Sequence, residues 1–269
     1  MSIGYNQFVR NVLLTIICGI AVFSLAYFGN YLRGLYDINK NSLSPIVNLS
    51  ATPAPKNSPN IIDLDSNYRL TWVLEEDLSK LKLYSNLTQE KTAKKLYEEG
   101  NCKALVNGGF YSKEDTHIGL FVTSEGKLND KSNNDLFDGF FTVNKGIAAI
   151  SNTPPTEEPT IALQAGPTLF RNSKPIVLSI KNDENERRTA VATTSKGDVI
   201  FLMFYNKEST YLGPKLEEVP ELLNEFSRLT GIPITSALNL DGGTASAFYT
   251  DGVSLGELTK IGSYFCILD

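Results

Sequence analysis

The 269-residue chain contains one histidine, His117, and only three cysteines. A zinc site built from several imidazoles is therefore excluded, and any metal ion would need oxygen ligands. Lysine and arginine form no continuous basic stripe, and the formal net charge is −5. Because nucleic-acid binding depends on clustered positive charge, we expect no nucleic-acid partner. No cofactor is indicated with certainty, and a divalent cation held by oxygen atoms stays open.

The scarcity of cysteine leaves a single pair to consider. Cys18 lies inside a long apolar segment, so Cys102 and Cys266 are the two cysteines of the remaining chain. Neither belongs to a C-x-x-C motif, and redox catalysis is not indicated. The two residues could form a disulfide or remain two buried thiols, and the sequence does not decide between these states.

Residues 12–29 form a long uncharged run, VLLTIICGIAVFSLAYFG, with Arg10 and Arg33 on its two sides. Its length just reaches across a bilayer core and exceeds the apolar part of a usual signal peptide, about 7–15 residues. We predict an uncleaved single-pass membrane anchor; a cleaved secretion signal, cut near residues 24–26, is the alternative. The flanking positive charges nearly balance and do not set the orientation. The short leader and the large following domain favour an extracytoplasmic domain.

The composition changes twice along the chain. Residues 1–38 are predicted to hold a short cytoplasmic stub and the anchor. Residues 39–60 contain four prolines and many Ser and Asn, a composition that cannot bury enough apolar surface to fold and is typical of an extended linker. The folded domain is therefore predicted over residues 61–269.

Short apolar segments rich in Val, Ile, Phe, Tyr and Thr dominate this domain and predict strands. We expect strands over residues 69–74, 104–106, 119–122, 139–143, 147–150, 160–163, 176–180, 189–193, 199–205, 236–240 and 264–268. The fold class is predicted as α+β, a single sheet-rich domain with a mixed sheet and packed helices behind the N-terminal transmembrane helix.

Two helices are predicted in this domain. The first helix is predicted over residues 88–99. A capping-box pattern that starts at Asn86 precedes it, and Gly100 ends it. Residues 221–230 have Pro220 near their first turn and Gly231 just past their end. Leu222, Leu223, Phe226 and Leu229 fall on one face of the second helix, which should pack on the sheet.

Each predicted helix leads into a strand that ends in a polar residue and two glycines. The first unit ends in Asn107-Gly108-Gly109, and the second ends in Asp241-Gly242-Gly243. Such glycines let a ligand approach the backbone, and their N–H groups can form a concave nest for an anion. Each loop alone also fits an ordinary hairpin turn. Both strands read as central strands, whose ends often carry ligand sites.

With these loops, the chain resembles the phosphodiester glycosidase family. The resemblance runs from about residue 78 to the C-terminus and rests on five motifs in the family's order: LVNGGFY (105–111), HIGLFVTSEGKL (117–128), LQAGPTLFRNSKPI (163–176), RRTAVATTSKGDVIFLMF (187–204) and ALNLDGGTASAFY (237–249). His117 stands where the family often has proline, and Ala245-Ser246 matches the usual Gly/Ser pattern only in part. These departures concern substrate choice more than the fold.

The resemblance implies a hydrolase that cleaves the glycosidic bond of a sugar-1-phosphodiester in a glycan or envelope polysaccharide. Phosphate is a good leaving group, so the main requirements are charge neutralisation and a carboxylate near the sugar. Asp241 is the candidate catalytic carboxylate, as base, nucleophile or metal ligand, and Asn107 is the second candidate catalytic residue. Arg188 could bind the phosphate through its guanidinium fork, or it could be a surface charge in the run DENERR.

Further substrate contacts are predicted from the matched motifs. Asn107 and Asn239 could hold sugar hydroxyls or a metal-bound water, or simply cap turns. The other candidate substrate-binding residues are Gly108, Gly109, Gln164, Thr189, Gly242, Gly243 and Ser246. Ser246 has no histidine partner for a nucleophilic triad. His117 is expected to be structural or to lie at the rim, with a general-acid role left open.

Two other functions fit the same residues. The first is a carbohydrate-binding or envelope-assembly protein that keeps the fold without turnover, and it should tolerate Asn at position 241. The second is a metal-dependent phosphoester hydrolase, which would cut the P–O bond and lose activity with a chelator.

Overall fold

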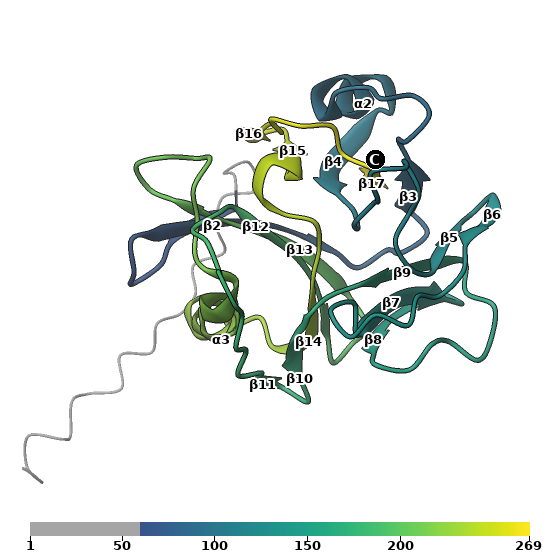
Figure 1. Cartoon of the computed structure of the whole chain (residues 1–269). Helices are drawn as coiled ribbons and strands as arrows, with labels where there is room; N and C mark the ends of the chain where they lie inside the picture. Colours follow the sequence, from purple (N-terminus) through teal and green to yellow (C-terminus); the bar gives the residue numbers. More distant parts are fainter. Residues whose placement is uncertain (1–59) are drawn as a thin grey trace, which may run out of the picture. The chain divides into compact units, whose positions relative to one another are not determined.

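The computed structural model describes residues 60–269, which form three antiparallel sheets and two α-helices (Figure 1). The first sheet has the strand order β1 (Ile61–Asp63), β2 (Tyr68–Glu75), β13 (Val199–Asn206), β12 (Arg188–Thr194), β14 (Ile234–Asn239), β10 (Thr168–Arg171) and β11 (Lys174–Pro175). The second has the order β16 (Val253–Leu255), β15 (Phe248–Thr250), β4 (Cys102–Asn107), β17 (Ser263–Leu268) and β3 (Leu81–Ser85). The third has the order β6 (Gly126–Asn129), β5 (Phe121–Thr123), β9 (Ile161–Ala165), β7 (Gly139–Asn144) and β8 (Ile147–Ser151).

The predicted single mixed sheet is wrong, because every strand pair in the described residues is antiparallel. Helix α2 (Ala93–Glu99) connects β3 to β4, but β17 lies between these two strands. Helix α3 (Val219–Thr230) connects β13 to β14, and β12 lies between them in the same way. Both helix–strand units are therefore crossovers split by a strand from elsewhere in the sequence. In each unit the strand after the helix, β4 or β14, is an interior strand of its sheet.

The second predicted helix is confirmed in its main features. Pro220 lies in the first turn of α3, and Gly231 ends the helix with a φ of 72°, a conformation that glycine adopts at little cost. Leu223 and Phe226 are buried, and the Phe226 ring meets Trp72 of β2 edge-on with centroids 5.4 Å apart. Leu229 was assigned to the packing face wrongly, since it is 43% exposed.

The first predicted helix begins later than expected. Thr92, not Asn86, is the N-cap of α2, and its hydroxyl accepts a hydrogen bond from the Lys95 N–H at 3.4 Å. The fully buried Asn86 side chain instead binds the backbone of Lys91 and donates to the Ile261 carbonyl at 2.9 Å. Its role is to fix the turn before the helix. α2 ends at Gly100 as predicted.

One predicted strand is absent, the segment 176–180. Its alternating pattern does reflect packing, since Leu178 and Ile180 contact the core beneath α3, while Val177 is 97% exposed. Pairing with a neighbouring strand ends with the two-residue β11, directly before this segment, and residues 176–180 themselves pair with no strand. The alternation of apolar residues therefore predicted correctly which side chains are buried, but the segment is extended without being a strand.

Three buried clusters hold the domain together. The largest lies among the three sheets, the second between the first sheet and α3, and the third between the second sheet and α2. No helix in residues 60–269 has the length and apolar character needed to cross a membrane. The predicted anchor, residues 12–29, and most of the predicted linker lie outside the described residues, so both stay predictions.

Cys102 and Cys266 form a disulfide between the adjacent strands β4 and β17, with their Cα atoms 5.4 Å apart. Because this bond joins residues 164 positions apart, it restricts the unfolded chain strongly. We predict that reduction lowers the free energy of unfolding by about 3 kcal/mol, measured by urea unfolding with and without dithiothreitol.

The matched control for that measurement is the double variant Cys102→Ala/Cys266→Ala. It should unfold at the reduced protein's urea concentration whether or not reductant is present. An unchanged midpoint of the parent protein after verified reduction of the bond would contradict the prediction.

Candidate active site

The two glycine loops meet at the ends of β4 and β14. The Asp241 N–H donates to the Gly108 carbonyl at 3.1 Å, and the Asn107 side-chain amide donates to the Asp241 carbonyl at 2.6 Å. The two loops are therefore joined by direct hydrogen bonds. It arises because β4 and β14 are interior strands of their sheets and each leads straight into its loop.

Asn107 is the residue that joins these loops. Its Nδ2 also donates to the Gly108 carbonyl at 3.3 Å, and its Oδ1 accepts from the Thr189 hydroxyl and from the Ala247 N–H, both at 3.0 Å. The amide thus uses both its donors and both its acceptor positions inside the protein. Since Asn107 and Thr189 are also fully buried, we assign both a positioning role for the Asp241 loop.

Asp241 is partly exposed at this junction. Its Oδ1 accepts a hydrogen bond from the N–H of Gly242 at 3.0 Å. Burial by the surrounding protein raises the pKa of the Asp241 carboxyl from its ordinary 3.8 to about 7, opposed by that hydrogen bond and reinforced by the negative charge of Glu186. A carboxylate poised near neutrality in this way is typical of a proton-transferring group.

Two titratable side chains lie beside Asp241. Tyr111 donates its hydroxyl to the Lys260 carbonyl at 2.8 Å, and burial, followed by the charge of Asp241, raises the pKa of this tyrosine. Glu186 packs against Gly243, where an added Cβ would lie 2.7 Å from its Oε2. Asp241 and Glu186 therefore form a pair of neighbouring carboxylates.

Arg188 flanks this pair from β12. Its Nε donates to the Pro214 carbonyl at 3.1 Å and its Nη2 to Asp183 at 3.0 Å, while its Nη1 lies 3.8 Å from Glu186 Oε2. The side chain is only 11% exposed, and its burial lowers the pKa of the guanidinium. Arg188, the residue predicted to bind phosphate, thus uses Nε and Nη2 within the protein, and its Nη1 lies near Glu186.

Arg187 occupies the interior behind the Asp241 loop. It donates through Nε to the Ser246 hydroxyl at 2.9 Å, and through Nη2 to the Ser246 carbonyl at 2.8 Å and the Gly256 carbonyl at 2.6 Å. The Ser246 hydroxyl in turn donates to the Gly243 carbonyl at 2.6 Å. Ser246 is completely buried, so it supports the loop and is not placed to contact substrate.

The N–H groups of the paired glycines bind other parts of the protein and do not form an open anion nest. The N–H groups of Gly108 and Gly109 donate to Ser263 of β17, at 2.7 and 3.1 Å. The N–H of Gly242 is taken by Asp241, and that of Gly243 donates to the Arg187 carbonyl at 2.8 Å. All four groups are occupied, which corrects the expectation that they are free to bind phosphate.

Gln164 and Asn239 are buried, and their side chains bind backbone groups rather than the two glycine loops. The Gln164 amide binds the backbone of Leu120, Ser132 and Phe137 through four hydrogen bonds of 2.8–3.1 Å and so fixes the segment 131–138. Asn239 donates to the Gly166 carbonyl at 2.9 Å. Both are buried, and their hydrogen bonds support positioning roles.

His117 is structural, as expected from the sequence. Its ring stacks on Phe121 with centroids 3.7 Å apart, and its Nε2 is 2.9 Å from the Ser85 hydroxyl. Burial lowers the pKa of this histidine to about 4, so the ring is neutral at physiological pH. Its Nδ1 has no hydrogen-bond partner in the described residues.

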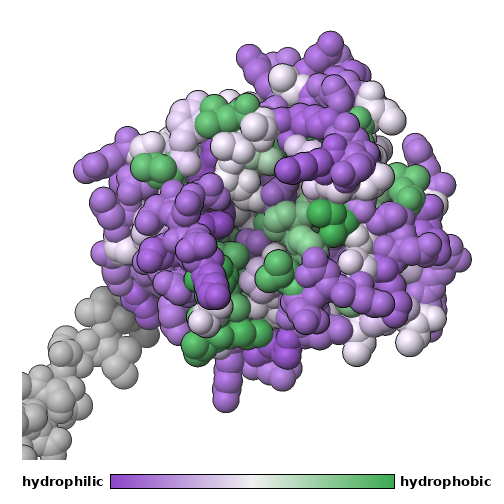
Figure 2. Space-filling view, viewed as in Figure 1, coloured by the Kyte–Doolittle hydropathy of each residue, from purple (hydrophilic) through white to green (hydrophobic). Residues whose placement is uncertain are grey.

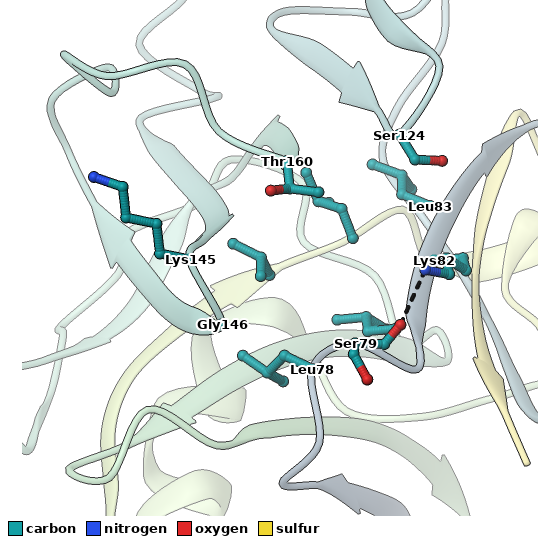
Figure 3. A pocket seen from close by; sticks show the side chains of 11 residues that line it. Leu78, Ser79, Lys82, Leu83, Ser124, Lys145, Gly146 and Thr160 are labelled. Carbon is teal, nitrogen blue, oxygen red and sulfur yellow. Dashed lines mark hydrogen bonds between the residues drawn. The ribbon is translucent and has the colours of Figure 1, made fainter.

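Hollows also occur elsewhere on the domain. One of about 220 Å³ lies between β3, β9 and the turn from β7 to β8, with Lys82 and Lys145 at its sides (Figure 3). It contains none of the predicted site residues. Another of about 370 Å³ is bordered by the segment 131–138 and reaches Gln164. No group of three or more His, Cys, Asp or Glu side chains in residues 60–269 is placed to hold a metal ion.

The domain thus combines three antiparallel sheets with a partly exposed carboxylate, Asp241, at the meeting point of two glycine loops. Residues 100–264 match the phosphodiester glycosidase family. This match spans more than half of the chain, and the chain therefore belongs to that family, which is a family of hydrolases. No curated protein matches the sequence.

Two solved structures are similar in fold. One is the catalytic domain of zebrafish N-acetylglucosamine-1-phosphodiester alpha-N-acetylglucosaminidase, auto-inhibited by its pro-peptide, with a TM-score of 0.56, 14% identity, and coverage of 80% of this chain and 85% of that chain. The other is a hypothetical protein from Synechocystis, with a TM-score of 0.51, 12% identity, and coverage of 77% and 61%. At these identities the similarity concerns the fold alone.

Sequence reasoning missed Glu186, Arg187 and Tyr111 as parts of this region. Tyr111 was inside a matched motif but carried no charge to single it out. Glu186 and Arg187 belong to the run DENERR, whose composition is typical of a solvated surface. Only the structure shows that Arg187, the residue before β12, points inward.

Proposed function

We propose that this protein hydrolyses the glycosidic bond of a sugar-1-phosphodiester in a glycan or envelope polysaccharide. The observation that carries the proposal is Asp241, a partly exposed carboxylate with its pKa raised to about 7, held where the two family loops meet. Membership of the phosphodiester glycosidase family supports the same reaction class.

In the proposed reaction Asp241 is the general base. Water attacks the anomeric carbon, and its proton passes to the Asp241 carboxylate. The bond between the anomeric carbon and the phosphate oxygen breaks, and the electron pair leaves with that oxygen. The products are the free reducing sugar and a phosphate monoester, so no acid is needed to protonate the leaving group. Arg188 Nη1 would neutralise charge on the departing phosphate.

The direct test follows the bond that is cut. Purified protein is incubated with N-acetylglucosamine 1-phosphate methyl ester in water enriched in oxygen-18. Mass spectrometry then shows which product has taken up the oxygen-18 label. Label in the reducing sugar supports the proposal. Label in the phosphate, with activity abolished by a chelator, would instead identify a metal-dependent phosphoester hydrolase. Binding of the ester without turnover would identify a carbohydrate-binding protein.

The pH dependence gives a second prediction. Because the base must be ionised, turnover should rise with pH through about 7 and level off above it. The titratable groups beside Asp241 are Glu186 and Tyr111. Glu186→Gln removes a negative charge that disfavours ionisation of Asp241, so the rising limb should move to lower pH, measured as kcat/KM against pH.

The control for the pH profile is Glu184→Gln, the same substitution at an exposed neighbour in the sequence. It should leave the position of the rising limb unchanged. A limb that does not move in Glu186→Gln would show that Glu186 has no influence on the proton transfer.

We further propose that residues 12–29 anchor the protein in a membrane and that the catalytic domain faces away from the cytoplasm. The uncharged run and the Pro-rich segment after it support this arrangement. Alkaline carbonate washing of membranes, with protease protection of the domain, distinguishes an anchored from a released protein.

A further inference from the structure

The segment that follows β11 forms a free edge of the seven-stranded sheet. Residues 176–180 are extended, with Leu178 and Ile180 packed on the core and Val177 almost wholly exposed. β11 is the outer strand of this sheet, and no strand in the described residues lies beyond it. Within the same part of the chain, the backbone groups of residues 177–180 form no hydrogen bonds. The segment therefore combines the side-chain pattern of a strand with unused backbone donors and acceptors.

The pairing with β10 stops for a local reason. One hydrogen bond follows β11, from the Ile176 N–H to the Leu169 carbonyl at 2.9 Å. The register of the two strands would next place Leu178 opposite Pro167, which has no N–H to donate. The Pro167 carbonyl accepts a hydrogen bond from the Asn239 N–H at 3.1 Å. β10 thus offers Leu178 neither a donor nor a free acceptor.

The next backbone groups point away from the sheet. In an antiparallel ladder, successive residues direct their N–H and C=O groups to opposite sides of the strand. Because Ile176 directs its N–H toward β10, Val177 and Ser179 direct theirs to the open side. The side chains of both residues are exposed as well. An extended peptide could therefore add here as a further strand, a mode of recognition in which backbone hydrogen bonds supply the affinity.

The charges beside this edge indicate the chemistry of its partner. Residues 171–181 contain Arg171, Lys174 and Lys181 and no acidic residue, although the whole chain has a net charge of −5. Neither lysine forms an ion pair within residues 60–269. Opposite charges on neighbouring strands stabilise their pairing, and like charges oppose it. An acidic strand therefore complements this edge.

A second copy of the chain and a lipid surface fit this edge less well. Two copies would bring two sets of three cations together, and Pro175 and the lysines hinder pairing between two like edges. A lipid surface offers no strand to the free backbone groups, and Val177 is the only strongly exposed apolar side chain in residues 171–181. On the face shown in Figure 2, apolar groups occur as separate patches within a largely hydrophilic surface, so that face has no broad apolar area for a partner.

We propose that residues 174–181 bind an extended acidic peptide of a partner protein, which adds as a strand to the free edge of the sheet. The backbone groups of Val177 and Ser179 pair with the peptide, and Lys174 and Lys181 bind its acidic residues. None of these residues belongs to the candidate active site, so this binding is separate from the proposed hydrolysis.

The test uses the full-length protein and synthetic peptides. A fluorescently labelled peptide with the sequence DETVTVTED is titrated with protein and followed by anisotropy, and hydrogen–deuterium exchange of the protein is measured in parallel. We expect binding, with slower exchange of the Val177 and Ser179 amides. The peptide KKTVTVTKK has the same core and the opposite charge, and it should bind at least about tenfold more weakly.

Two substitutions at one position separate the backbone from the side chain. Ser179→Pro removes an outward N–H and should weaken binding of the acidic peptide about tenfold, the scale of one hydrogen bond. Ser179→Ala keeps that N–H and should bind like the parent protein. Charge is tested independently of proline: the double variant Lys174→Glu/Lys181→Glu should bind the lysine peptide more tightly than the acidic one.

The other occupants of this edge are distinguished by the same exchange measurement. Unchanged exchange of the Val177 and Ser179 amides with the acidic peptide, or equal binding by Ser179→Pro and Ser179→Ala, would overturn the proposal. Exchange that slows with protein concentration in the absence of peptide would identify a second copy as the occupant instead. Slowing only with vesicles of phosphatidylcholine and phosphatidylglycerol would identify a membrane and likewise reject the peptide.

Discussion

Replacement of Asp241 by Asn is expected to lower turnover of a sugar phosphodiester by about 10³-fold, the scale of a lost general base. Asn keeps the shape of the side chain and an oxygen for the Gly242 N–H, so the loop should stay in place. The measurement is release of reducing sugar under saturating substrate, with the affinity for substrate determined separately.

The same variant should be more stable than the parent protein at neutral pH and above. The folded-state pKa of Asp241 is raised from 3.8 to about 7, so its ionisation opposes folding. The difference between the proteins should be smallest below pH 4, grow between pH 4 and 7, and stay constant above. A full shift of this size corresponds to about 4 kcal/mol, and partial exposure of the side chain reduces the expected gain to about 2 kcal/mol.

Asp251→Asn, in the exposed turn between β15 and β16, is the control for both readings. It should change neither turnover nor the pH dependence of unfolding. If Asp241→Asn retains turnover within a few fold of the parent, Asp241 is not the base. If neither the parent nor Asp241→Asn shows any turnover and both bind the ligand, the chain is a carbohydrate-binding protein.

The second large effect concerns Arg187. Its truncation in Arg187→Ala removes hydrogen bonds to the buried hydroxyl and carbonyl of Ser246 and to the partly buried Gly256 carbonyl, and it leaves a cavity behind the Asp241 loop. Each buried acceptor that is left without its hydrogen-bond donor lowers the free energy of unfolding by about 1–3 kcal/mol. We therefore predict a loss of about 5 kcal/mol in the free energy of unfolding, measured by urea unfolding monitored by circular dichroism.

Arg228→Ala gives the matched comparison, because Arg228 is an exposed arginine of α3 that pairs with Asp65 at 2.8 Å. A surface ion pair contributes about 0–1 kcal/mol, so this variant should unfold almost like the parent protein. Arg187→Lys should lie between the two, since an ammonium cannot reproduce the fork of three bonds. Equal losses in Arg187→Ala and Arg228→Ala would refute the supporting role of Arg187.

Several elements could be predicted from residues alone because their signals are local. Pro220 and Gly231 delimit α3 through backbone preferences that act within one helical turn. The strands around residues 139–143, 189–193 and 199–205 have apolar side chains on both faces, and all three are present in the structure. The first helix was predicted too long because Asn86 uses its amide to fix a turn, a choice that depends on Ile261 far along the chain.

The order of the strands in the sheets could not be predicted from the sequence, because contacts between distant segments determine which strands pair. The helix–strand units suggested a mixed sheet, but β17 and β12 each enter between the two strands that a helix connects. Nothing in the units themselves marks this insertion. For the same reason the segment 176–180 looked like a strand although it has no partner.

The sequence by itself determined that two loops of similar composition, Asn107-Gly108-Gly109 and Asp241-Gly242-Gly243, end two helix–strand units, and that the chain resembles phosphodiester glycosidases. The tertiary structure decided what those loops do. Hydrogen bonds from Asn107 join them, Ser263 and Arg187 take up glycine N–H groups, and Asp241 is left as the group with a raised pKa. A carboxylate acquires that property only from the burial and charge around it, and those depend on residues far apart in the sequence.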